Sequence, residues 1–321
     1  MAQTGDLERT SHLITNTLKA WWAFSRPHTI IGSFFSITSL FLIAAALYGS
    51  QSSQPVWDVV DHYTWQYLIT LLSALACNLF IVGLNQWQDL EVDRINKPWL
   101  PLAAGSISLR QAKLAVWSSL LLSLVTSSLL GWWFFLLILL INLIGAAYSL
   151  PPLKLKRHHL PAAFAIVLVR GLLVNLGMSA HFMQQMGQPA TIPEAVWPLA
   201  LFIVGFSFGI AWFKDIPDTE GDEKFHFKTL AVSMNRQTAL WLGVAVVGLS
   251  YVAVSASPFV LLMPVQTAFF SLSHLALGLL FIYRSARLNL DNPSAVKQFY
   301  MFFWLLFFVE YIIYPLSFLI A

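Results

Sequence analysis

The stretch QYLITLLSALACNLFIVGLNQWQDLEVD, residues 66–93, contains the two features that decide the architecture of this chain. Residues 66–88 are mostly apolar over a length that can cross a bilayer, for which a helix needs about 20 residues. The run ends in Asn85, Asp89 and Asp93, which are spaced i, i+4 and i+8. Continued helix would place these three side chains on one face. The stretch therefore predicts a transmembrane helix that ends in a column of oxygen ligands.

The rest of the chain has the composition of a membrane protein. Of its 321 residues, 58% are hydrophobic and 10% are charged, whereas soluble domains have about 25% charged residues. We therefore predict an all-α integral membrane protein, with a single domain over 27–321 whose helices surround a central cavity. Nine apolar runs are predicted to span the lipid bilayer, at 27–48, 66–88, 112–130, 132–150, 161–182, 196–213, 238–257, 260–283 and 298–320.

Short breaks separate some of these runs. Only Gly131 divides the third run from the fourth, which predicts a tight helical hairpin, and Ser257-Pro258 is expected to divide the seventh from the eighth. Residues 1–26 are predicted to form a polar segment with an interfacial helix. This segment lacks the compact apolar region of a signal peptide and the acid-poor composition of an organelle import leader. The first span is therefore expected to act as its own insertion signal.

The loop charges predict the orientation in the membrane. When the loops are assigned alternately to the two sides, 17 of the 18 Lys and Arg residues fall on one side. By the positive-inside rule this side is cytoplasmic, so the N-terminus and the cavity mouth are expected there and the C-terminus on the opposite side. A net charge of +3 on such a protein does not indicate nucleic-acid binding.

A second acidic stretch, Asp215-Ile-Pro-Asp218-Thr-Glu-Gly-Asp222, follows the sixth apolar run on the same predicted side. Asp215, Asp218 and Asp222 are spaced i, i+3 and i+7, which is one face if the segment is helical. Pro217 and Gly221 interrupt it, so a helix end that opens into a loop is the other interpretation. Eight of the 15 acidic residues of the chain lie in or directly beside these two stretches.

Paired acidic clusters indicate a cation. Close carboxylates repel one another unless a cation lies between them, and Mg²⁺ shares one or two protein carboxylates with substrate phosphates. Two facing clusters could each hold one Mg²⁺ ion, with a diphosphate between the ions. The alternative is a set of solvated charges and an interfacial tyrosine at the membrane border. The candidate metal ligands are Asn85, Asp89, Asp93, Asp215, Asp218 and Asp222, and the candidate diphosphate ligands are Asn85, Arg94, Lys97, Tyr148, Lys154, Arg157 and Lys214.

One basic and one acidic residue lie deep within predicted spans, Arg170 in the fifth and Glu310 in the ninth. Charges inside a membrane are expensive and indicate either an internal pair or a functional site. Three interpretations are open: an Arg170–Glu310 ion pair, a role for Arg170 toward a substrate carboxylate in the central cavity, or an arginine that reaches the headgroups along its stem.

The chain resembles the UbiA-type membrane prenyltransferases over nearly its whole length. Asn85, Asp89 and Asp93 match the N-x-x-x-D-x-x-x-D motif of that family, and Asp218 and Asp222 match its D-x-x-x-D motif, with Asp215 as an additional upstream acid. The resemblance implies nine transmembrane helices and a prenyl diphosphate that is bound through Mg²⁺, here expected as two ions. It also implies that Asp89, Asp93, Asp218 and Asp222 take part in catalysis.

Within the family, four segments resemble the homogentisate prenyltransferases: Arg26-Pro-His-Thr-Ile-Ile-Gly32, 93–105, Tyr148-Ser-Leu-Pro-Pro152 and Lys214-Asp-Ile-Pro-Asp-Thr-Glu-Gly-Asp222. The resemblance implies transfer of a phytyl group from its diphosphate to homogentisate, with loss of carbon dioxide, in tocopherol biosynthesis. The candidates for holding the acceptor carboxylate are Arg170, His28 and Arg26. The missing import leader is similar to cyanobacterial members, which implies an inner or thylakoid membrane.

Alternatives remain at this stage. Geranylgeranyl or solanesyl diphosphate could replace the phytyl donor, and another aromatic compound could replace homogentisate. A secondary transporter for anions would have broken helices at matching positions of two halves and charges near the middle of the membrane. The two acidic stretches here lie instead at one predicted face. A purely structural membrane subunit would leave the paired acidic clusters without a purpose.

Overall fold

A computed structural model describes residues 16–217, 219–224 and 228–321 of the chain. These residues form helices and no β-strand, and residues 16–24 are helical ahead of the first labelled element. The elements are α2 (Pro27–Ser52), α3 (Val56–His62), α4 (Thr64–Gln88), α5 (Leu90–Asn96), α6 (Leu109–Ser128), α7 (Trp132–Ser149), η1 (Leu155–Arg157), α8 (His159–Ile166), η2 (Val167–Gly177), α9 (Met178–Gln185), η3 (Glu194–Val196), α10 (Trp197–Phe213), α11 (Thr219–Lys224), α12 (Leu230–Ser233), α13 (Arg236–Leu261), α14 (Thr267–Ala286) and α15 (Pro293–Leu319).

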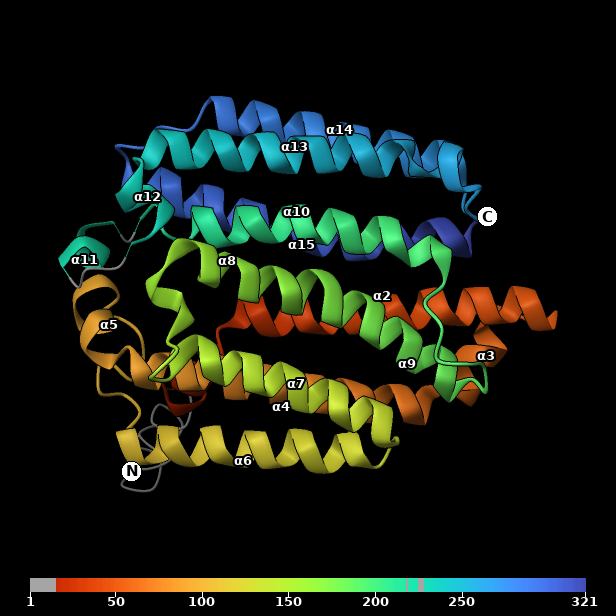
Figure 1. Ribbon diagram of the computed structural model, residues 1–321, viewed down its shortest axis with the longest axis horizontal. Coiled ribbons are helices and arrows are strands. Elements are labelled where there is room, and N and C mark those ends of the chain that lie inside the picture. The colour runs from red at the N-terminus through yellow and green to blue at the C-terminus, as the bar shows by residue number, and fades with distance from the viewer. Residues whose placement is uncertain (1–15, 218, 225–227) are drawn as a thin grey trace, which may run out of the picture.

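The long helices lie side by side in a bundle, and several short helices gather at one end of it (Figure 1). This end holds α5, α11 and α12, and α5 contacts α11 although more than 120 residues separate them in sequence. Because α5 contains Asp93 of the first acidic stretch and α11 belongs to the second, the two stretches meet at this end. This proximity is what the predicted facing clusters require.

Eight of the described helices are long and apolar enough to cross a membrane, which makes the protein a multi-pass integral membrane protein. Among the described helices of 18 residues or more, α6 lies outside this set, and it packs against α4 and α7 in the bundle. Its Ser and Thr hydroxyls lower its hydropathy, yet most of them donate to backbone carbonyls one turn earlier, as Ser119 does to Ala115 at 2.6 Å. Nine spans, with α6 as the ninth, stay a prediction.

Local sequence explains where several helices begin and end. Gly131 adopts φ 105° between α6 and α7, so the hairpin expected there is confirmed. The break expected at Ser257-Pro258 is wrong, because α13 continues through Pro258 to Leu261. A proline cannot donate to the carbonyl four residues earlier, and Ser257 Oγ donates to that carbonyl, of Val254, at 2.8 Å. The helix ends where Leu262 adopts φ 46°.

The centre of the bundle is filled by aromatic rings on α10 and α15. Phe206 stacks on Phe303 with ring centroids 3.9 Å apart, and the Phe213 ring meets Phe303 edge-on at 4.9 Å. Gly209 permits this close approach, because a Cβ there would lie 2.6 Å from the Phe303 ring. Such rigid packing fixes the end of α10, which leads directly into the second acidic stretch.

Candidate active site

A cavity of about 950 Å³ opens between the helices where the acidic stretches meet. Apolar side chains line its larger part, among them Ile37, Ile138, Ile141 and Met178. The predicted site residues that line it are Arg26, His28, Asn85, Asp89, Asp93, Lys97, Tyr148, Arg170, Lys214 and Asp215. The cavity therefore joins a highly charged portion to a long apolar one, as a molecule with an anionic head and a hydrocarbon tail requires.

The first acidic stretch is not one continuous helix. Asp89 lies at the junction of α4 and α5 with φ −105° and ψ 14°, and its backbone accepts from Asp93 N at 2.7 Å while donating to Asn85 O at 3.0 Å. The predicted single helical column is thus broken at Asp89, but all three side chains still line the cavity. Asp93 is buried, and Asn85 donates to Ser149 Oγ at 3.5 Å, at the end of α7.

Lys156 is the main site residue that the sequence interpretation missed. Its Nζ lies 2.5 Å from Asp89 Oδ2, and the two side chains are 6% and 13% exposed. The other carboxylate oxygen of Asp89, Oδ1, is buried and has no hydrogen-bond partner in the described part of the chain. Burial lowers the pKa of Lys156 to about 8, although Asp89 acts in the opposite direction. A buried lysine that faces a half-satisfied carboxylate is well placed to meet an anion.

The second acidic stretch begins in a turn after α10. Lys214 Nζ lies 3.0 Å from Asp215 Oδ1 and donates to Tyr148 Oη at 3.3 Å. Burial disfavours the charged form of Lys214, but Asp215 and Tyr148 hold its pKa well above its usual range. The stretch is therefore not one continuous helix, because α10 ends at Phe213, a turn covers residues 214–217 and α11 begins at Thr219. Asp218 lies outside the described residues, and Asp222 lies in α11 with a side chain that is not described.

The donor set of this cavity suits Mg²⁺. Three buried or nearly buried carboxylates, from Asp89, Asp93 and Asp215, line the same space, and the unpartnered Oδ1 of Asp89 supplies a ligand atom. Among the described residues no three acidic, His or Cys side chains are close enough to hold a metal by themselves. Mg²⁺ commonly completes its octahedron with water and substrate phosphate, so this arrangement fits an ion that is bound together with a phosphate ligand.

Three basic residues of the predicted diphosphate set lie elsewhere. Arg94 pairs with Glu91 at 2.8 Å on the surface, with side chains 54% and 72% exposed. Arg157 is exposed, and neither it nor Lys154 lines the cavity. The 3₁₀ turn η1 explains the difference, because it directs Lys156 inward while its neighbour Arg157 faces outward. Spacing alone could not distinguish these lysines, since the turn geometry decides which one faces the cavity.

The two ionisable residues inside the bundle do not pair with each other, so that interpretation is wrong. Glu310 Oε1 lies 3.1 Å from His274 Nε2, and both side chains are fully buried. Arg170 lines the cavity and lies over the rings of Trp304 and Phe307, at 5.1 and 6.0 Å from their centroids. The Glu310 partner is thus a histidine of α14 and not an arginine of η2.

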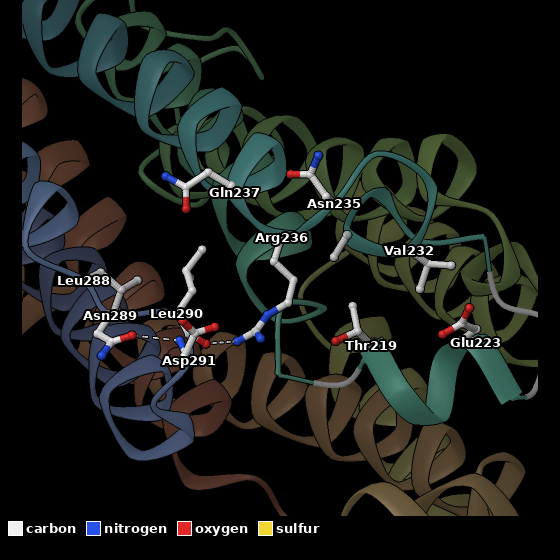
Figure 2. A pocket seen from close by; sticks show the side chains of 11 residues that line it. Thr219, Glu223, Val232, Asn235, Arg236, Gln237, Leu288, Asn289, Leu290 and Asp291 are labelled. Carbon is white, nitrogen blue, oxygen red and sulfur yellow. Dashed lines mark hydrogen bonds between the residues drawn. The ribbon is translucent and has the colours of Figure 1, made fainter.

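A second hollow, of about 770 Å³, lies at the ends of α13 and α14 (Figure 2). Arg236 reaches across it and donates to the Leu290 carbonyl, and Asn289 Oδ1 accepts from Asp291 N at 2.9 Å. Thr219 and Glu223 of α11 line the opposite side. These contacts fix the connection between α14 and α15, and the buried carboxylates of the first cavity have no counterpart among the described residues here.

The sequence profile of the UbiA prenyltransferase family matches residues 32–306. This chain belongs to that family. Two relatives of the UbiA chain are homogentisate phytyltransferase from Synechocystis sp., 40% identical over 94% of this chain and 96% of that protein, and homogentisate geranylgeranyltransferase from Triticum aestivum, 36% identical over 96% and 74%. A UbiA homolog from Archaeoglobus fulgidus, bound to GPP and Mg²⁺, has the same fold, with TM-score 0.63, 20% identity and 94% and 100% coverage.

Proposed function

We propose that this UbiA-family protein transfers a phytyl group from phytyl diphosphate to homogentisate, with release of diphosphate and carbon dioxide. The observation that supports this proposal is the cavity, in which buried carboxylates and lysines at one end lead into a long apolar space. A phytyltransferase from Synechocystis is 40% identical over 94% of the chain. The shared family and the matching chemistry of the cavity agree on a prenyl diphosphate donor.

The charged end of the cavity would hold the diphosphate. Asp89, Asp93 and Asp215, with Asp218 and Asp222 beyond the described side chains, would hold Mg²⁺ as two ions. Mg²⁺, when bound, neutralises charge on the phosphate oxygens and favours departure of diphosphate. Lys156, Lys97 and Lys214 line the same end and supply the further positive charge that a diphosphate needs.

The reaction forms one carbon–carbon bond and breaks two bonds to leaving groups. The allylic C–O bond breaks and its electron pair leaves with the diphosphate. A ring carbon of homogentisate attacks the allylic carbon and then loses its proton. The carboxylate leaves as carbon dioxide, and the electron pair left on the benzylic carbon takes up a proton. Aromatic faces such as Trp304 can stabilise the electron-poor prenyl group, and the apolar lining excludes water.

Arg26, His28 and Arg170 lie where an aromatic acid could enter beside the prenyl group. All three line the cavity, and His28 meets Trp304 edge-on with centroids 4.9 Å apart. The basic loops support a charged end that faces the cytoplasm, with the C-terminus on the opposite side. A cyanobacterial inner or thylakoid membrane is the location that we propose.

Purified protein tests this proposal. With Mg²⁺, labelled phytyl diphosphate and homogentisate, it should yield a prenylated and decarboxylated quinol that mass spectrometry identifies. Equal concentrations of geranylgeranyl and solanesyl diphosphate in the same reaction would rank the donors, and phytyl should be preferred. If well-folded protein forms no product from any of these donors, the enzymatic function is wrong and an anion transporter becomes the next hypothesis.

A further inference from the structure

Arg170 is a cation inside the bundle that has no acidic partner among the described residues. It lies eleven residues after the first residue of α8, which is roughly 15 Å along a helix that rises about 1.5 Å per residue. Among the described residues, no carboxylate lies within 4.0 Å of its guanidinium and no side-chain acceptor binds it. A charged side chain at such depth normally has a partner. The N–H groups of Arg170 that no described side chain binds therefore indicate a ligand.

Two aromatic rings orient the guanidinium without using its N–H groups. Its central carbon lies 5.1 Å from the Trp304 ring centroid and 6.0 Å from that of Phe307. A guanidinium that lies over a ring face keeps its N–H donors in its own plane, where they can bind both oxygens of a carboxylate. The aromatic contacts therefore hold the guanidinium in place and leave its N–H groups available to bind a planar anion.

A locally widened helix presents Arg170 to the cavity. Residues Val167–Gly177 form the π-helix η2, and π-helical turns occur frequently at functional sites. Asn175 Nδ2 donates to the carbonyls of Arg170 and Gly171, at 2.7 and 3.0 Å. Tyr311 in turn donates to Asn175 Oδ1 at 2.8 Å, with all the polar atoms of the amide engaged. This network fixes the backbone carbonyl of the very residue whose side chain lacks a partner.

The diphosphate is a poorer match for Arg170 than a carboxylate is. Lysines, buried acids and Tyr148 lie at the helix ends, where Lys156 and Lys214 already face the acidic residues. Arg170 lies deeper, beside Trp304 and in contact with the apolar part of the cavity. A flat anion on an aromatic ring fits this environment better than a metal-bound diphosphate.

We propose that Arg170, held in place by the Asn175–Tyr311 hydrogen bond, binds the carboxylate of the aromatic acceptor and makes the protein selective for aromatic acids. This inference rests on the proposed function and names the residue that selects its second substrate. Asn175 acts as a positioning residue, since it donates to the Arg170 carbonyl, and Tyr311 supports it by donating to Asn175 Oδ1.

Paired acceptors test the proposal. Homogentisate and methylhydroquinone share the dihydroxybenzene ring, and only homogentisate has a carboxylate. Arg170→Gln should lower kcat/KM for homogentisate by about 10- to 100-fold, the effect of a lost charged hydrogen-bond pair. It should leave kcat/KM for methylhydroquinone and the KM for the prenyl donor within about threefold of wild type. Tyr311→Phe should produce a smaller loss with the same selectivity.

A matched control is available on the bundle surface. Arg284 also lies over an aromatic ring, with its guanidinium 5.0 Å from the Phe302 centroid, but it is exposed and outside the cavity. Arg284→Gln should leave kcat/KM unchanged for both acceptors. Arg170→Lys retains the charge and serves as a second variant if Arg170→Gln fails to fold. It should recover part of the homogentisate activity. Its thermal unfolding midpoint should stay near that of wild type.

Equilibrium binding separates this inference from the proposed function. Calorimetric titration of the wild type with homogentisate and with its methyl ester needs no turnover, and the acid should bind more tightly, with Arg170→Gln abolishing the difference. Equal losses for both acceptors, or a raised donor KM, would show that Arg170 has a general or diphosphate role and would overturn the inference. Absence of product from the wild type would instead overturn the proposed function, and the binding comparison would still decide the role of Arg170.

Discussion

Lys156 Nζ lies 2.5 Å from Asp89 Oδ2, and this contact joins the loop after α7 to the junction of α4 and α5. Both side chains are nearly buried, so the ion pair is shielded from solvent and orients the carboxylate. The unpartnered Oδ1 of Asp89 remains available toward the cavity. One lysine thus orients a predicted metal ligand and adds positive charge where the diphosphate is expected.

Replacement of Lys156 by Met should weaken donor binding. It removes a cation from the diphosphate end and leaves Asp89 without its ion partner, so we expect kcat/KM for the prenyl donor to fall at least tenfold, about 1.4 kcal/mol of transition-state stabilisation. Steady-state kinetics with varied donor measures this effect. Arg157→Met is the matched control, because Arg157 follows in the same turn and is exposed. Equal effects of the two substitutions would contradict the assignment of Lys156.

Removal of Mg²⁺ should abolish turnover. Chelation with EDTA followed by excess MgCl₂ should restore product formation, because the buried carboxylates need a cation to accept a diphosphate beside them. Thermal unfolding gives an independent measurement. The midpoint should rise when Mg²⁺ and inorganic diphosphate are added together, and by clearly less with either alone. If diphosphate in the presence of EDTA raised the unfolding midpoint as much as diphosphate with Mg²⁺ does, metal-mediated binding would be contradicted.

The buried His274–Glu310 pair should contribute to folding and not to catalysis. His274→Ala leaves the Glu310 carboxylate buried without its ion partner, and such a loss typically costs about 3–5 kcal/mol. Denaturant unfolding in detergent should show this loss, while activity per folded molecule stays near wild type. The double substitution His274→Leu with Glu310→Leu should recover much of the stability. Strong loss of kcat in folded His274→Ala protein would assign the pair a catalytic role instead.

Close packing between η2 and α10 should make Gly171 intolerant of substitution. A Cβ on Gly171 would lie 2.6 Å from Val204 Cγ2 and 3.0 Å from Val204 Cα, so the backbone itself would have to move. We expect Gly171→Ala to cost about 1–3 kcal/mol and to lower activity, since Arg170 is the adjacent residue. Gly248→Ala is the control, because its nearest neighbour would be Ile282 Cδ1 at 3.8 Å. Denaturant unfolding should therefore show a clearly lower free energy of unfolding for Gly171→Ala than for Gly248→Ala.

The sequence predicted the positions of the helices well where apolar length or a single turn residue determines them. Apolar length located most long helices to within a few residues, although α14 begins at Thr267 and not at residue 260, and Gly131 located the hairpin. The break at Pro258 was wrong because a serine hydroxyl replaces the missing backbone donor. Both acidic stretches were found from spacing, since their carboxylates are scarce in an apolar chain.

Site features that depend on distant contacts could not be predicted in the same way. The support of η2 requires Asn175 and Tyr311, which are 136 residues apart in sequence. The inward direction of Lys156 follows from a three-residue turn and its contact with Asp89. Pairing of Glu310 with His274 depends on how α14 packs against α15. Each requires the packed bundle, which spacing within one segment does not reveal.

The central claim is that the buried carboxylates at the helix ends bind the prenyl diphosphate through Mg²⁺ and so permit prenyl transfer. Product formation by Asp89→Asn and Glu91→Gln, measured with labelled phytyl diphosphate, Mg²⁺ and homogentisate, tests it most directly. The two acids lie two residues apart, but Asp89 lines the cavity and Glu91 is on the surface, paired with Arg94. Glu91→Gln should retain wild-type turnover within about twofold, and folded Asp89→Asn should retain less than about a tenth, a loss above roughly 1.4 kcal/mol. Asp89→Asn activity above that level would contradict the claim.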